Sequence, residues 1–219
     1  MKKTFLFLLG ISAALMASAE IRVLSDVKLG EGYFPRFADA ETVTYLTSEN
    51  ATYVQASSDA ELRVDNENLD LNLYRNGKKI VLKPHGEENY ICASLSPDQT
   101  RILFRTKKGT AICDLAGKEI VNLGSEINAP VWYGNDYVVG MDSEHDGYHN
   151  TSAAIVIASV ETKKMQYLTD PADMGIFPNV DAASGRIVYC TEGGDIRMLQ
   201  LNLTEQPIRK TTPRLMQKP

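Results

Sequence analysis

Short apolar runs alternate with polar turns along most of this chain, and one combination of them recurs four times. The copies cover residues 35–46, 93–104, 130–139 and 178–189, and each has a short strand-like run, a polar turn and a second apolar run. Repetition at this scale predicts supersecondary units that stack against one another and share a core. Outside residues 1–19 no window has the spacing of an amphipathic helix, so we expect an all-β protein.

The clearest unit begins near Tyr90 and has the pattern of four strands. We expect them over residues 91–96, 101–105, 110–114 and 119–123, with a turn between each pair. In the first turn, Pro97 fixes its own φ and Asp98 can bond the turn backbone.

The other units follow the same order with different connections. One has expected strands over 131–133, 137–141, 153–159 and 165–168, with a long connection over 142–151. The last has strands over 187–190 and 196–203. Between Tyr45 and Ile80, the first unit has enough chain for an additional hairpin.

Several motifs in these units resemble the repeat of the TolB-like β-propeller family. The motifs are a Ser-Pro-Asp turn at 96–98, an Ile-Leu-Phe strand at 102–104, the third strand and turn at 112–118, and Leu-Thr-Asp at 168–170. Gln99 stands where the family usually has glycine after the Ser-Pro-Asp turn. The resemblance implies four-stranded sheets arranged radially around a channel. It also implies a binding platform, or the non-catalytic propeller of a larger hydrolase.

We therefore predict a small β-propeller of four-stranded antiparallel blades, with four blades visible and five possible. Residues 23–26 match residues 167–170, which end a unit, so the mature chain begins with a strand of the unit-closing type. Such a strand can complete the last blade and close the ring. The expected organisation is a propeller domain over residues 20–212 and a C-terminal tail over 213–219.

Residues 1–19 have the pattern of a cleavable signal peptide. Lys2 and Lys3 precede an apolar stretch at 5–16, and small residues at 17–19 form a cleavage site. Removing them leaves 21 basic and 28 acidic residues, a net charge of −7. We expect a periplasmic or secreted protein with no nucleic-acid partner and no membrane insertion after signal cleavage.

The cysteines and the catalytic motifs point to no cofactor. Cys92, Cys113 and Cys190 all lie in apolar runs, which favours buried thiols, and no cysteine or histidine spacing is that of a zinc site. The sequence has no nucleophile elbow, phosphate-binding loop or dinucleotide fingerprint. We therefore assign no catalytic residue, no metal and no cofactor.

The repeat order assigns the connections to two faces. In a four-stranded meander, second-to-third turns and blade-to-blade connections emerge together, and all three histidines lie in such connections. We predict an acidic ligand-binding face with histidine and tyrosine side chains around the channel mouth. Its expected residues are Tyr33, Arg36, His85, Glu87, Tyr90, Asp142, Glu144, His145, Asp146, Tyr148 and His149. The turn at 96–98 is expected on the opposite face, as scaffold.

Residues 142–149 are the sharpest local candidate on this face. Asp142, Glu144 and Asp146-Gly147 resemble the first half of a calcium loop, but Ala153 stands where the bidentate glutamate belongs. His145 and His149 could bind a transition metal together with a carboxylate. An ordinary acidic turn remains the favoured interpretation of this segment.

Three functional hypotheses remain open at this point. The leading one is an exported, non-enzymatic propeller that binds a protein or peptide through the histidine-bearing loop face. The second is a small glycan-active or metal-dependent propeller enzyme. The third is a structural partner that completes its ring by oligomerisation.

Overall fold

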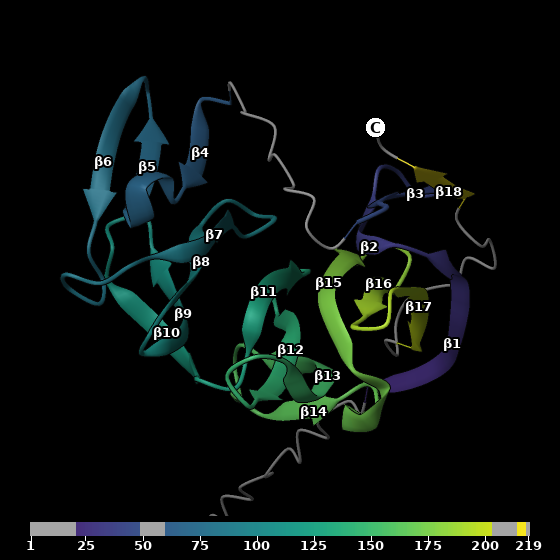
Figure 1. Cartoon of the computed structure of the whole chain (residues 1–219). Helices are drawn as coiled ribbons and strands as arrows, with labels where there is room; N and C mark the ends of the chain where they lie inside the picture. The colour runs from purple at the N-terminus through teal and green to yellow at the C-terminus, as the bar shows by residue number, and fades with distance from the viewer. Residues whose placement is uncertain (1–20, 49–59, 203–213, 218–219) are drawn as a thin grey trace, which may run out of the picture.

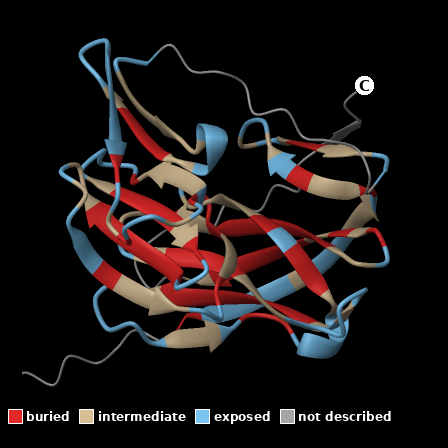
Figure 2. Ribbon diagram, turned by 60° about the vertical axis from the view of Figure 1, so that its left-hand side comes forward, coloured by how far each residue is buried: buried red, intermediate tan, exposed pale blue. Residues whose placement is uncertain are grey.

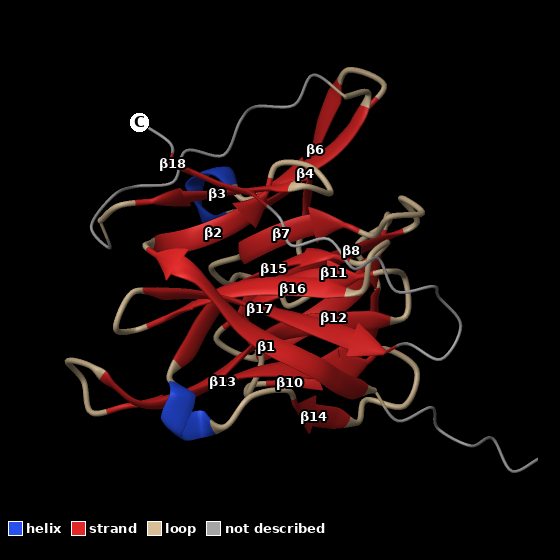
Figure 3. Ribbon diagram, turned by 90° about the vertical axis from the view of Figure 1, so that its right-hand side faces the viewer, coloured by secondary structure: helices blue, strands red, loops and turns tan. Residues whose placement is uncertain are grey.

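The computed structural model describes residues 21–48, 60–202 and 214–217, in which nearly all regular secondary structure is β-strand (Figure 3). No helix in these ranges is long and apolar enough to span a membrane. Residues 1–19, expected to be a signal peptide, lie outside the described residues.

The unit that begins near Tyr90 is an antiparallel four-stranded sheet, as predicted. Its strands are β7 (Ile91–Leu95), β8 (Arg101–Thr106), β9 (Gly109–Asp114) and β10 (Glu119–Gly124). In the turn after β7, the hydroxyl of Ser96 donates to Asp98 at 2.5 Å. Asp98 in turn accepts from the backbone N–H of Thr100 at 3.1 Å.

The next sheet has the predicted strand order but a shorter connection. Its strands are β11 (Asn128–Tyr133), β12 (Tyr137–His145), β13 (Asn150–Ser159) and β14 (Met165–Tyr167). The long connection predicted over 142–151 is wrong, because the ladder between β12 and β13 continues from Tyr137 paired with Ser159 to His145 paired with Asn150. Only residues 146–149 remain as a turn.

The N-terminal strand completes the last sheet, as the match between residues 23–26 and 167–170 predicted. That sheet contains β1 (Arg22–Glu31), β17 (Asp195–Asn202), β16 (Arg186–Thr191) and β15 (Gly175–Asp181), in this spatial order. β1 runs antiparallel to β17, with Arg22 opposite Asn202 and Glu31 opposite Asp195. A 3₁₀ helix, η2 (Pro171–Asp173), precedes β15.

The first part of the chain departs from the four-stranded pattern and divides into two three-stranded sheets. One contains β2 (Tyr33–Phe37), β3 (Thr42–Leu46) and β18 (Arg214–Gln217). β18 runs parallel to β3, so the segment expected to be a tail contains a strand. The other sheet contains β4 (Leu62–Asp65), β5 (Leu71–Arg75) and β6 (Lys78–Leu82), with a 3₁₀ helix, η1 (Glu67–Leu69), after β4.

The five sheets form an arc (Figure 1). Strand packing follows the order β4 against β7, β7 and β8 against β11, β11 against β15, and β15 against β2. The β4–β6 and β2–β3–β18 sheets are therefore the two ends of the arc. We call β2, β7, β11 and β15 the inner strands, because each begins its unit and packs against the inner strand of a neighbour.

The four inner strands run in the same direction. The turn after β7 contacts the turn after β11, where Asp98 N–H donates to Asn135 Oδ1 at 3.1 Å. Similarly, Arg186 after β15 donates to the carbonyl of Ala40 after β2. We call this end of the sheets the turn face, and the end where inner strands begin the loop face. This common direction identifies a small β-propeller arrangement with four blades.

The β4–β6 sheet has the opposite direction and is an end cap rather than a fifth blade. Asn66 and Leu69, at and after the end of β4, accept hydrogen bonds from the backbone N–H groups of Ala93 and Tyr90, where β7 begins. The start of β4 lies near Gln99, where β7 has ended. β4 therefore runs antiparallel to β7.

Apolar side chains between neighbouring sheets form the core (Figure 2). Tyr189 and Ile155 pack between the last two blades, and Phe104 and Leu73 pack between the end cap and its neighbour. Cys113 and Cys190 are buried thiols, as predicted, whereas Cys92 is partly exposed.

Candidate functional site

Every inner strand carries a bulge near the loop face. The pairing with the second strand shifts between Tyr33 and Arg36, and at the equivalent place in the three other blades. Within each shift lies one residue with positive φ: Phe34 (51°), Cys92 (56°), Ala129 (45°) and Phe177 (52°). Positive φ is costly for side chains of this size, and bulges with strained backbone concentrate near functional sites.

Sequence reasoning missed this feature, although the repeat contains a signal for it. Proline follows three of the four positive-φ residues, at positions 35, 130 and 178. Because proline has no N–H, it cannot continue the ladder, and within sheets it occurs at edges and bulges. A proline at the same place in three repeats therefore indicates a repeated bulge.

The bulges of the first and last blades bring two aromatic rings together at the loop face. The ring centroids of Phe34 and Phe177 are 4.7 Å apart, with 42° between the planes. Phe177 is 36% exposed, although it lies in an inner strand. Tyr33 precedes Phe34 and lies against the β16–β17 turn, where a Cβ on Gly194 would be 3.0 Å from the Tyr33 hydroxyl.

An unpaired carboxylate oxygen lies in the same turn. Glu192 Oε2 is buried and has no hydrogen-bond partner among the described residues. The backbone N–H of Glu192 donates to the carbonyl of Met174 at 3.0 Å, which fixes the turn beside the start of β15. We call Tyr33, Phe34, Phe177 and Glu192 the mouth cluster. It combines aromatic faces with a negative charge at one junction between blades.

Two of the predicted loop-face residues are instead part of the scaffold. Tyr90 is buried, and its hydroxyl accepts from the backbone N–H of His85 and donates to the carbonyl of Gly86, both at 2.9 Å. The His85 ring is also buried, with Nδ1 2.7 Å from Thr106 Oγ1 and Nε2 2.6 Å from Glu119 Oε2. Their pattern of apolar and polar neighbours in the sequence does not reveal this burial.

The order hydroxyl, imidazole and carboxylate is that of a hydrolase triad, but the surroundings are not those of an active site. Thr106 is only 3% exposed, so a substrate carbonyl has no access to its hydroxyl. The same hydroxyl accepts the backbone N–H of Lys108 at 3.1 Å, and the Lys108 ammonium donates to the carbonyl of His85 at 2.7 Å. These bonds attach the connection before β7 to the β8–β9 turn.

Six of the predicted residues lie at the end of the β12–β13 hairpin, which we call the hairpin tip: three are in the last part of β12 and three are in the exposed turn at 146–149. Asp146 Oδ1 accepts the backbone N–H groups of Tyr148 and His149 at 2.8 and 2.9 Å. These bonds hold the pKa of Asp146 below its usual value. Tyr148 is 91% exposed. The six residues are Asp142, Glu144, His145, Asp146, Tyr148 and His149.

Polar side chains of the hairpin tip form hydrogen bonds within the hairpin and with β14. Tyr167 donates its hydroxyl to Asp142, and this hydrogen bond raises the pKa of Tyr167. Within the described residues, no three His, Cys, Asp or Glu side chains form a group that could hold a metal ion. Elsewhere, Glu87 forms an exposed ion pair with Lys83, and Arg36 is an exposed residue of β2.

The comparisons with known proteins give remote structural matches only. No protein-family model and no curated protein sequence matches the chain. An oligogalacturonate lyase from Vibrio parahaemolyticus has a TM-score of 0.48 at 11% identity, over 81% of this chain and 55% of that chain. An oligogalacturonate lyase in complex with manganese has a TM-score of 0.42 at 15% identity, over 57% of this chain and 40% of that chain.

TolB from Acinetobacter baumannii is also among the matches, with a TM-score of 0.37 at 13% identity, over 82% of this chain and 45% of that chain. The match therefore spans about half, or less, of each of these three chains. Membership of a TolB-like family, which the repeat motifs suggested, has no support from a family model. The β-propeller assignment rests on the strand order and direction described above.

Proposed function

We propose that this chain is an exported binding module that holds a protein or peptide partner at the loop face, with the mouth cluster contacting a basic side chain of the partner. The observation that carries this proposal is the buried, unpaired oxygen of Glu192 beside Tyr33 and the Phe34–Phe177 ring pair. Although Oε2 is buried, Glu192 as a residue is partly exposed, so a lysine or arginine side chain would approach the carboxylate from its exposed side and lie over the electron-rich ring faces.

Charge and backbone geometry support the same partner. The full chain has a net charge of −5, which attracts a basic segment over a distance before contact is made. The positive φ of Phe34 and Phe177 turns both rings away from the ladder positions they would occupy in a regular strand. Aromatic and arginine contacts dominate the energy of many protein interfaces.

The test uses the chain from residue 20 onward and a positional-scanning library of labelled hexapeptides. We expect binding to be strongest for pools with lysine or arginine at one or more positions. Glu192→Gln keeps the size of the side chain and removes its charge, so it should remove the preference for basic pools. Phe177→Ala should weaken binding of all pools about tenfold or more.

Ile120→Ala is the matched control, because Ile120 is an exposed apolar residue on the outer strand β10. It should leave binding unchanged. A library without any preference for basic pools, or equal binding by Glu192→Gln and the unchanged protein, would contradict the proposed function.

Export is tested independently of binding. The full chain expressed in a bacterium should accumulate in the periplasmic fraction with Glu20 as its first residue. N-terminal sequencing and intact mass of the fractionated protein measure this directly. Retention of Met1 in the cytoplasmic fraction would overturn the export proposal and would leave the binding test unaffected.

A further inference from the structure

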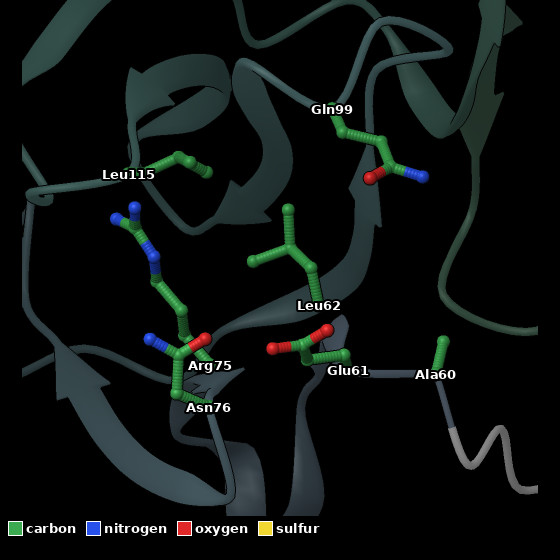
Figure 4. A pocket seen from close by; sticks show the side chains of 7 residues that line it. All are labelled: Ala60, Glu61, Leu62, Arg75, Asn76, Gln99 and Leu115. Atoms are coloured by element: carbon green, nitrogen blue, oxygen red, sulfur yellow. The ribbon is translucent and has the colours of Figure 1, made fainter.

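A cavity with both charged and apolar lining residues lies at the turn face, between the end cap and the β7–β10 sheet. Its volume is about 470 Å³, within the range of small-molecule sites. It is formed by the start of β4, the β5–β6 turn and two turns of the neighbouring sheet (Figure 4). The lining residues that matter for its chemistry are Glu61, Leu62, Arg75, Asn76, Gln99 and Leu115.

The direction of the end cap creates this cavity. Because β4 runs antiparallel to β7, its first residues and the β5–β6 turn lie beside the turn after β7. Asn76 and Gln99 both have positive φ, at 51° and 58°, so each belongs to a tight turn whose tip faces the cavity. The Ser-Pro-Asp-Gln turn therefore also lines the cavity, through Gln99.

Two opposite charges line the cavity without neutralising each other. Arg75 pairs with Leu62, the first residue of β4, and Glu61 immediately precedes that strand. The side chains of Glu61 and Arg75 form no hydrogen bond or ion pair with the described residues. In Figure 4 the Arg75 guanidinium extends toward Leu115, whereas the Glu61 carboxylate lies below Leu62.

We propose that this cavity binds a zwitterionic ligand with an apolar side chain, which is the chemistry of an amino acid or a short peptide. Arg75 binds the carboxylate through its fork of N–H donors, and Glu61 binds the ammonium group. Leu62 and Leu115 contact the apolar side chain. The side-chain amides of Asn76 and Gln99 can donate to a peptide carbonyl and accept a peptide N–H.

The lining favours this ligand class over two others. A phosphate group is bound by several cationic side chains or by backbone N–H groups at a helix N-terminus, and the described lining residues include one cation and no helix. Nucleobases stack on aromatic rings, and the described lining residues include no aromatic side chain. The cavity lies on the opposite face from the mouth cluster, so this inference is independent of the proposed function.

The experiment compares four probes by ¹H–¹⁵N NMR titration of the chain from residue 20 onward. Leucyl-leucine has both charged ends, N-acetyl-leucyl-leucine lacks the ammonium, leucyl-leucinamide lacks the carboxylate, and free leucine is the single amino acid. We expect saturable shifts for leucyl-leucine at residues 61, 62, 75, 76, 99 and 115, and about tenfold weaker binding of each blocked dipeptide. Free leucine distinguishes an amino-acid site from a peptide site.

Substitutions identify the site. Arg75→Gln and Glu61→Gln should each weaken leucyl-leucine binding about tenfold, and Arg75→Lys should restore part of the loss. Lys163→Gln, an exposed site in the β13–β14 turn, is the control and should bind like the unchanged protein. Because Glu61 and Arg75 are exposed, the thermal melting curves of these variants should match that of the unchanged protein. No shifts at 10 mM dipeptide, or equal binding of leucyl-leucine and its acetylated form, would overturn the proposal.

Discussion

Backbone conformation at single residues determines how each blade begins. Three of the four positive-φ residues in the inner strands have side chains larger than alanine, so the surrounding ladder must compensate for the strain. In the blade of β11, the neighbouring strand β12 accommodates the bulge by means of a glycine. Gly140 faces the bulge there, and a Cβ at this position would lie 2.5 Å from Ile127 Cγ2 and 2.7 Å from the carbonyl oxygen of Asn128.

We predict that Gly140→Ala destabilises the protein by about 1–3 kcal/mol, because the new methyl group overlaps backbone and core atoms. Urea unfolding followed by circular dichroism measures the loss. Gly193→Ala is the control, since φ is not positive there and the nearest atom, Thr191 Oγ1, is 3.7 Å from the Cβ position. Equal stability of the two variants would show that the bulge adjusts freely.

A buried ion pair connects the last blade to the first. The Arg186 side chain is fully buried and donates to Asp181 Oδ2 at 2.9 Å and to the carbonyl of Ala40. Burial alone would raise the pKa of Asp181, but the hydrogen bonds from Ser184 and Arg186 outweigh it and hold this pKa below its usual value. The ionised form of Asp181 is therefore the stabilising one.

This direction of shift predicts how stability changes with pH. The unfolded state, with an Asp pKa of about 3.9, binds more protons than the folded state at mildly acidic pH, so stability falls as pH falls through the folded pKa. Asp181→Asn should lower stability at pH 7 by about 2 kcal/mol, because a hydrogen bond to a charged group is lost. It should also flatten the dependence between about pH 5 and pH 2, measured by urea unfolding at each pH. If the stability of the unchanged protein and that of Asp181→Asn depended on pH in the same way, the ionised Asp181 would not be the stabilising form.

At the scale of elements, β1 is attached to the last blade by its ladder and by one polar cluster. Asp26 accepts the Tyr189 hydroxyl at 2.8 Å and the Arg197 Nε–H at 3.0 Å. Tyr189 is fully buried, and burial raises the pKa of its hydroxyl. Without Asp26 this donor would lose a charged acceptor in a setting that water reaches poorly.

A double-mutant cycle tests this attachment. Asp26→Ala should cost about 1–3 kcal/mol, and Tyr189→Phe should cost less, because it removes the hydroxyl rather than leaving it unpaired. The combined variant should be more stable than the sum of the single losses predicts, with a coupling of about 1 kcal/mol. Strict additivity would mean that β1 is held by its ladder alone.

Strand positions were largely predictable from the sequence, and hairpin lengths were not. The pattern of Ile-Leu-Phe and its turns places β7–β10 within about one residue of their observed ends, because apolar runs and turn residues alternate there. The acidic sequence of residues 142–145 predicts a loop, yet these residues continue β12. Backbone pairing with β13 outweighs their low strand propensity, which is a tertiary effect that a local pattern does not contain.

At the scale of the whole molecule, the repeat predicts the four blades but not the end cap. Four recurring phrases correspond to four inner strands of one direction. The reversal of β4 depends on two bonds between residues far apart in sequence, from Ala93 to Asn66 and from Tyr90 to Leu69. No pattern within either segment indicates these contacts, so the sequence leaves the register of this region open.

Some features of the candidate site can also be predicted from the sequence, and others depend on contacts between distant segments. The repeat order assigns the β12–β13 connection to the loop face, and the strand directions place it there, because a connection can be assigned to a face from strand order alone. The bounds predicted for it, 142–151, were too wide. His85 and Tyr90 are different, since Tyr90 is buried against end-cap residues such as Leu73, and the His85 ring is buried against Phe104, Thr106 and Glu119. The mouth cluster depends on packing between the first and last blades, whose residues are more than 140 positions apart.

The arc also predicts how the molecule opens. The main contacts of each described sheet are with its neighbours along the arc, as in repeat proteins, so an end sheet should separate more easily than a central one. Leu73 packs the end cap against Tyr90 and Phe104, whereas Ile155 lies in the core between the last two blades. Each should lose about 2–5 kcal/mol on substitution by alanine.

Hydrogen exchange distinguishes the two losses. In Leu73→Ala, amides of residues 62–82 should exchange faster while those of 150–159 stay protected, because the end cap opens without the blades. In Ile155→Ala, exchange should accelerate in β11–β17, because this core joins two central sheets. Hydrogen exchange of both variants is measured by mass spectrometry, under conditions in which the two have lost the same free energy of unfolding. Uniform acceleration in Leu73→Ala would mean that the end cap and the four blades unfold as one cooperative unit.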